Sequence, residues 1–276
     1  MRRTLQRHII WLFVLGTYAW TWAVQGSGAL AAHGFGRASW SNGAYTMAGF
    51  APTLVAVALV ALAEGRAGLA LLWSRLRAVR VPPRWYAVAA LLPLLTEGGS
   101  LLVLPILGRP LPALGAWYTP FLMTLFLIPL TGLLEEVGWR GLMLHRLQER
   151  MHPLAATLLV ALAWGAWHIP SYLRTMPEGA RTPELLAWFL VGVLPLSVIF
   201  TWLYNVTGQR LLPVIVLHAA VDAGAGYFFG PLPKGEFAPF STWVMLLIVC
   251  AGALLRWEGR QRGQTVGSVV ATRRPG

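Results

Sequence analysis

The 276-residue sequence has few charged residues: Asp, Glu, Lys and Arg make up only 12% of it, which is about half the usual share of a soluble domain. Hydrophobic residues make up 57%. A soluble fold of this length cannot hide so much apolar surface behind so little charge. The same composition excludes an intrinsically disordered chain. We therefore expect an integral membrane protein.

Cysteine and lysine are also scarce. The one cysteine, Cys250, lies in an apolar run, which excludes an internal disulfide and any cysteine-based metal site or redox pair. Lys234 is the one lysine, and the frequent Arg, Ala, Gly and Pro are typical of a bacterial protein from a GC-rich genome. The net charge of +12 comes from arginines in short connections between apolar runs. Membrane topology therefore explains the charge, and we expect no nucleic-acid partner.

Eight apolar runs, most of them near the roughly 20 residues that a helix needs to cross a bilayer, organise the chain. We predict an all-α polytopic membrane protein, a single bundle of about eight transmembrane helices over residues 9–256. A cytoplasmic N-terminus (1–8) precedes the bundle and a flexible cytoplasmic tail (257–276) follows it. The fourth run is longer than the others and contains Pro120 and Pro129, so we expect it to be tilted or kinked. The runs are Ile9–Val24, Ala44–Ala63, Trp85–Leu104, Trp117–Leu144, Leu154–Leu173, Leu185–Tyr204, Leu211–Phe229 and Phe240–Leu255.

The distribution of basic residues predicts the orientation of the bundle. Five of them lie in the odd-numbered connections, at positions 37, 109, 174, 181 and 234, whereas sixteen lie in the termini and the even-numbered connections. Positively charged connections stay in the cytoplasm. We therefore expect a multi-pass protein of the cell (inner or plasma) membrane with both termini cytoplasmic.

Acidic residues and histidines inside the apolar runs are the most informative feature of the sequence. Four of the ten acids, Glu97, Glu135, Glu136 and Asp222, fall within these runs, and so do His168 and His218. Charged groups at membrane depth are costly and mark functional sites by default. The alternative for each is a structural contact between helices, which for Glu97 and for an isolated His168 is about as plausible as a functional role.

Helical spacing arranges several of these side chains. Glu136 and Arg140 are four residues apart, in the favourable order for an ion pair on one helix face. Glu135 points about 100° away from Glu136 and must find its partner on another helix. His218 and Asp222 are also four apart. At 1.5 Å per residue, the acids and histidines of the fourth, fifth and seventh runs lie roughly 10–22 Å from the cytoplasmic ends of their helices, so they can meet at one site.

Two kinds of chemistry fit such a cluster. A carboxylate can act as general base on water, with one histidine orienting the water and the other polar groups stabilising an oxyanion. Alternatively, the set Glu135, His168, His218 and Asp222 provides nitrogen and oxygen ligands for zinc, which would activate a bound water. We expect Trp164 and its neighbours Trp139 and Trp167 to serve as packing and cavity walls.

Three segments together carry a resemblance to a known family. These are Glu135-Glu136-Val137-Gly138-Trp139-Arg140-Gly141, Trp164-Gly165-Ala166-Trp167-His168-Ile169-Pro170, and His218-x-x-x-Asp222. They resemble the motif series of the CPBP intramembrane proteases, which include the CAAX prenyl endopeptidases and the bacteriocin-processing and immunity proteins also called Abi. The resemblance covers about residues 8–256 and implies an eight-helix membrane fold.

The resemblance implies an intramembrane endopeptidase that cuts a peptide bond in a membrane-associated protein or peptide. By this resemblance Glu135 is the catalytic glutamate and activates water together with His168. Glu136 and Arg140 have a supporting role. His218 and Asp222 stabilise the oxyanion. The family more often has asparagine where Asp222 stands, and it has been described both as metal-dependent and as glutamic. The competing hypotheses are a non-catalytic transporter, an immunity or binding protein, and an ion pathway, each using the same polar cluster.

Overall fold

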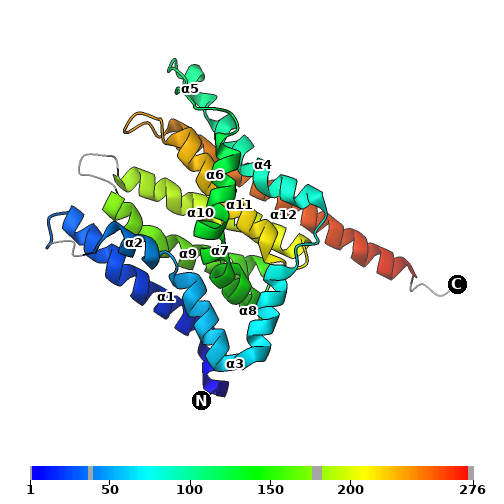
Figure 1. Ribbon diagram of the computed structural model, residues 1–276. Coiled ribbons are helices and arrows are strands. Elements are labelled where there is room, and N and C mark those ends of the chain that lie inside the picture. Colours follow the sequence, from blue (N-terminus) through cyan, green and yellow to red (C-terminus); the bar gives the residue numbers. More distant parts are fainter. Residues whose placement is uncertain (1, 37–39, 176–181, 273–276) are drawn as a thin grey trace.

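The computed structural model describes residues 2–36, 40–175 and 182–272, and within these ranges every regular element is a helix (Figure 1). Eight helical stretches are long and apolar enough to cross a membrane, which confirms the predicted polytopic, all-helical architecture. They are Arg2–Ala32, Ala51–Arg77, Pro83–Ile106, Thr119–Gln148, Pro153–Arg174, Pro183–Val206, Leu211–Phe229 and Ala238–Arg260.

Several of these stretches consist of more than one element. The α-helices are α1 (Arg2–Ala32), α2 (Asn42–Ala48), α3 (Ala51–Arg77), α4 (Pro83–Ser100), α5 (Val103–Ile106), α6 (Thr119–Leu127), α7 (Leu133–Glu136), α8 (His145–Gln148), α9 (Pro153–Thr175), α10 (Thr182–Val206), α11 (Leu211–Gly224) and α12 (Ala238–Thr272). Three π-helical segments complete the set: η1 (Ile128–Gly132), η2 (Val137–Leu144) and η3 (Ala225–Phe229).

The second span differs from the single run that its hydropathy predicts. Helix α2 is a separate short helix, capped by the Ser41 hydroxyl, which accepts a hydrogen bond from the Ala44 N–H. Helix α3 then continues past the predicted end, and at Gly65 its backbone takes φ 67° and ψ −151°, a conformation that glycine adopts readily and other residues do not. In Figure 1, α3 is consequently a V whose two arms meet at the lower end of the molecule.

The fourth span, which contains Pro120 and Pro129, is irregular. It passes through α6, η1, α7, η2 and α8 rather than forming one regular helix. Pro129 lies in η1, where it cannot donate a main-chain hydrogen bond to the preceding turn. Wide π-helical turns change the direction of the side chains that follow them, and they are frequent at functional sites. The short helix α7 lies between two of them.

Helix α11 lies in the middle of the bundle, where α4, α6, η1 and α10 pack around it. Glycines allow two of the closest approaches. An added Cβ at Gly132 would overlap the main-chain oxygen of Ile215, and one at Gly138 would lie 2.5 Å from the oxygen of Pro52. Glycine at these two positions therefore lets neighbouring helices approach closely.

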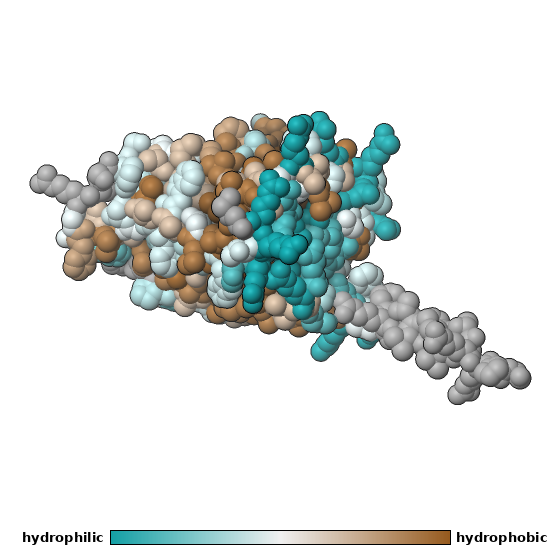
Figure 2. Space-filling view, turned by 90° about the horizontal axis from the view of Figure 1, so that it is seen from below, coloured by the Kyte–Doolittle hydropathy of each residue, from teal (hydrophilic) through white to brown (hydrophobic). Residues whose placement is uncertain are grey.

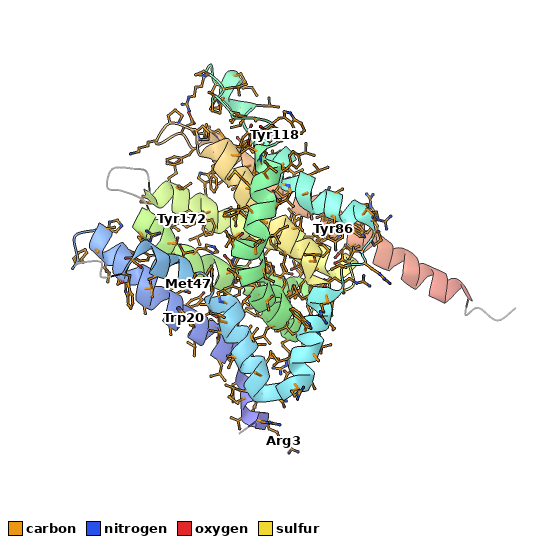
Figure 3. The ribbon with its side chains drawn as sticks, viewed as in Figure 1. Arg3, Trp20, Met47, Tyr86, Tyr118 and Tyr172 are labelled. Carbon is orange, nitrogen blue, oxygen red and sulfur yellow. The ribbon has the colours of Figure 1, made fainter. Side chains whose placement is uncertain are left out.

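The outer surface is largely apolar, and hydrophilic residues gather toward the end from which α12 emerges (Figure 2). Arg3, near the N-terminal end of α1, is exposed at the lower end of the molecule (Figure 3). A largely apolar body with polar ends is typical of a protein that lies in lipid. The backbone remains helical through Thr272, so part of the predicted tail continues α12, and its flexibility stays a prediction. The basic residues at 37, 181, 273 and 274 lie outside the described residues.

Candidate active site

The two adjacent glutamates of α7 are buried. Glu136 is fully buried and Glu135 is 8% exposed. Arg140, itself fully buried, donates to Glu136 Oε1 at 2.7 Å, so the predicted ion pair is present. The guanidinium also lies over the rings of Trp164 and Phe200, at 4.7 and 4.3 Å from their centroids. Aromatic faces and one carboxylate thus surround the charge, which offsets part of the cost of burying it.

His218 of α11 connects the two glutamates. Its Nδ1 lies 2.7 Å from Glu136 Oε1, the same oxygen that Arg140 binds. Since a carboxylate only accepts, Nδ1 carries the hydrogen of this bond, and Nε2 faces the rest of the site. The distance from Nε2 to Glu135 Oε1 is 3.8 Å. His218 is therefore oriented by Glu136 and directed at Glu135.

Glu135 finds its partner on another helix, as the helical geometry predicts. That partner is Trp164 of α9, whose indole Nε1 donates to Glu135 Oε2 at 2.7 Å. The sequence interpretation assigned Trp164 only to packing and missed this bond. The available signal was its spacing, four residues before His168 and hence on the same helix face.

His168 joins the cluster through Trp164. Its Nδ1 lies 2.9 Å from the Trp164 main-chain oxygen, so Nδ1 donates and Nε2 is left as an acceptor. The imidazole packs edge-on against the rings of Trp164, Trp167 and Phe189. One tryptophan residue therefore holds both Glu135 and His168, by its side chain and its main chain respectively.

Asp222 forms the open side of the cluster. Its Oδ2 lies 3.6 Å from His218 Nε2, and its side chain is 37% exposed whereas that of His218 is 4% exposed. The structure thus brings together five residues of the fourth and seventh spans, namely Glu135, Glu136, Arg140, His218 and Asp222. Trp164 of the fifth span links His168 to them. The convergence predicted from helix depth is present in the structure.

Glu97 lies on α4, outside this cluster. It is fully buried, and neither of its carboxyl oxygens has a hydrogen-bond partner among the described residues. Oε2 fills the space in which a Cβ at Gly224 would stand. Glu97 therefore packs against the turn of α11 that follows Asp222, and glycine at position 224 makes room for it.

In the described part of the chain, the predicted zinc ligands lie in one region but are not arranged around a common metal position. There, no group of three or more His, Cys, Asp or Glu side chains is arranged to hold a metal ion. Among the predicted ligands, His218 uses Nδ1 to bind Glu136, and its Nε2 lies 3.6 Å from Asp222 and 3.8 Å from Glu135. The chemistry derived below uses the side chains alone.

Comparison with known proteins adds a family relationship. Residues 117–224 match the family model of Rce1-like, type II CAAX prenyl endopeptidases. A CAAX prenyl protease 2 of Methanococcus maripaludis is 28% identical over 108 residues, which cover 38% of this chain and 40% of that protein. The chain thus matches about 40% of the length of this curated relative. The region matched by the family model contains all six residues of the cluster just described.

Proposed function

We propose that this chain is a CPBP-family intramembrane endopeptidase for a membrane-associated protein or peptide, which its motifs and its similarity to CAAX prenyl endopeptidases support. One observation carries the proposal: buried Glu135, on a membrane-spanning helix, is held by Trp164 Nε1 at 2.7 Å and faced by His218 Nε2 at 3.8 Å. A carboxylate fixed by one oxygen and free at the other is suited to act as a general base.

Glu135 activates the attacking water. The 3.8 Å between Glu135 Oε1 and His218 Nε2 is longer than a direct hydrogen bond, so Oε1 stays free to accept one from a water. Glu135 takes one proton from this water as its oxygen attacks the peptide carbonyl carbon. His168 accepts the second hydrogen at Nε2 and so orients the water. When the C–N bond breaks, the proton held by Glu135 passes to the leaving amine.

His218 and Asp222 stabilise the oxyanion. With both ring nitrogens protonated, His218 keeps its bond to Glu136 and donates from Nε2 to the developing negative charge. Asp222 is a second donor only when its carboxyl group carries a proton, because an ionised carboxylate cannot donate. Glu136 and Arg140 are positioning residues, since they set the direction of the His218 ring and do not touch the reacting atoms in this scheme.

The substrate enters from the membrane and the cut falls near the cytoplasmic side. Asp222 is the exposed member of the cluster, so the substrate approaches past it. We propose that the side with Arg75, Arg80 and Arg84, at the connection between α3 and α4, is cytoplasmic and that both termini lie on it. We further propose the cell membrane as the location.

Comparative membrane peptidomics tests the proposal. Cells that produce the wild type are compared with cells that produce Glu135→Ala, and new peptide termini in the membrane fraction are quantified. The account predicts termini that appear with the wild type and vanish with Glu135→Ala. A matched control is Glu149→Ala, an exposed acid beyond the same helical span, which should keep these termini. Identical termini in wild type and Glu135→Ala would instead favour a transporter or binding protein.

A further inference from the structure

The folded helix α3 encloses a groove that the proteolytic chemistry does not use. The groove has a volume of about 580 Å³, within the roughly 300–1,000 Å³ range of small-molecule sites. Its walls are the two arms of the V, with Val57 on the first arm and Trp73 on the second. Its floor is the helical turn Leu133–Val137, whose opposite side carries Glu135 and Glu136. Gly65 creates the groove, because it allows the two arms to meet at an angle.

The interior of the groove suits an apolar chain. Apart from Arg66, Thr53 is the one polar residue in its lining, and the Thr53 hydroxyl already donates to the Leu133 main-chain oxygen at 3.0 Å. A polar ligand would therefore find no unused hydroxyl there. Val57 and Trp73 are 38% and 51% exposed, so a hydrocarbon chain seated between the arms would cover apolar surface.

The rim of the groove carries positive charge. Arg66 is exposed and has no ion-pair partner among the described residues. The nearby acid Glu64 is already paired with Arg146. On the second arm, the Arg77 guanidinium lies 5.0 Å from the centroid of the Trp73 ring, over the same wall. An apolar groove with an unneutralised arginine at its mouth is complementary to a phospholipid whose headgroup is anionic.

We propose that this groove binds an anionic phospholipid, with one acyl chain between the arms of α3 and the headgroup at Arg66. Bound there, the lipid braces the V against the turn that carries Glu135 and Glu136. The lipid is thus a structural ligand of the protein, separate from any substrate.

Lipid titration of the purified, delipidated full-length chain tests this site. Native mass spectrometry follows binding of phosphatidylglycerol and of phosphatidylcholine with the same acyl chains, and thermal unfolding is measured in parallel. We expect phosphatidylglycerol to bind more tightly and to raise the unfolding temperature more. Arg66→Gln should weaken phosphatidylglycerol binding about fivefold and leave phosphatidylcholine binding unchanged. Arg150→Gln, which removes an arginine outside the groove, should leave both unchanged.

A second variant tests the groove itself. Ala70 lines the groove and is exposed, so Ala70→Trp fills the space without disturbing the core. It should abolish the response to both lipids. Equal binding of the two lipids by the wild type, or an unchanged response in Arg66→Gln and Ala70→Trp, would overturn the proposal. The proposal would also be overturned if the delipidated protein formed a dimer and Ala70→Trp dissociated it. In that case a second copy of the chain, and not a lipid, would cover the groove. None of these readouts depends on proteolysis.

Discussion

The indole Nε1 of Trp164 lies 2.7 Å from Oε2 of Glu135. This contact joins the fifth span to the fourth at the depth of the polar cluster, and it uses the only hydrogen-bonding group of the indole. It fixes one carboxylate oxygen and leaves the other directed at His218. The same residue accepts a hydrogen bond from His168 through its main chain. Trp164 is therefore a positioning residue for both groups that the proposal assigns to water.

Trp164→Phe tests this role. Phenylalanine keeps an aromatic face for Arg140 but removes the N–H, so Glu135 loses a hydrogen bond to a charged group. We expect proteolysis to fall about tenfold or more, because such bonds are worth roughly 1.5–3 kcal/mol. The protein should remain folded. The control is Trp167→Phe, since Trp167 Nε1 has no hydrogen-bond partner in the described part of the chain. Equal cleavage rates in the two variants would show that the Trp164 N–H does not position Glu135.

The buried pair of Glu136 and Arg140 makes a prediction about stability. Arg140→Met removes the buried arginine partner of Glu136, which keeps only its bond to His218, and should lower the free energy of unfolding by roughly 3–5 kcal/mol. Replacing both residues by methionine should recover much of that loss but not activity, because His218 loses the acceptor for Nδ1. Denaturant titration in detergent measures both effects. Arg109→Met, which breaks an exposed pair with Glu236, should cost about 1 kcal/mol or less. A similar small loss in Arg140→Met would contradict the buried-pair argument.

Gly224 and Glu97 make a matched pair for a packing test. Gly224→Ala places a methyl group where Glu97 Oε2 stands, and overpacking of this kind costs roughly 1–3 kcal/mol. Adding Glu97→Ala should restore the stability, since the obstructing carboxyl is gone. The control is Gly99→Ala on α4. An added Cβ there meets nothing within 4 Å, so this variant should keep the wild-type stability. If the double variant is no more stable than Gly224→Ala alone, the two residues are not in conflict.

Asp222→Asn distinguishes an oxyanion donor from a carboxylate ligand. An amide donates a hydrogen bond at every pH, so the side-chain mechanism predicts that this variant keeps or exceeds wild-type cleavage. Cleavage by the purified chain should also survive chelator treatment, with bound metals followed by elemental analysis. Loss of activity in Asp222→Asn together with inhibition by chelator would assign Asp222 to a metal site instead.

Much of the architecture follows from the sequence because lipid imposes strong rules. All eight predicted spans correspond to helical stretches of the structure, since a membrane admits few alternatives for backbone hydrogen bonds. The pair of Glu136 and Arg140 was predictable for a different reason. Both side chains lie on one helix, so local geometry alone brings them together.

Other features depend on contacts between helices that hydropathy does not encode. The fold of α3 at Gly65 rests on a single backbone conformation within an apolar stretch. The bond from Trp164 to Glu135 requires two spans to pack in one register. The prolines of the fourth span indicated an irregular helix, but they did not predict the π-helical turns on both sides of α7. The sequence therefore predicted the charged residues and histidines of the cluster, but it did not predict that the Trp164 side chain orients Glu135.

The central claim is that Glu135 activates water for peptide hydrolysis, and a cleavage assay in reconstituted membranes tests it most directly. A membrane peptide identified by peptidomics is incubated with wild type, Glu135→Gln and the control Glu149→Gln, each shown to be folded by thermal unfolding. The account predicts that Glu135→Gln lowers the single-turnover rate by roughly 10²–10⁴-fold and that Glu149→Gln retains the wild-type rate. Cleavage by folded Glu135→Gln at the wild-type rate would contradict it.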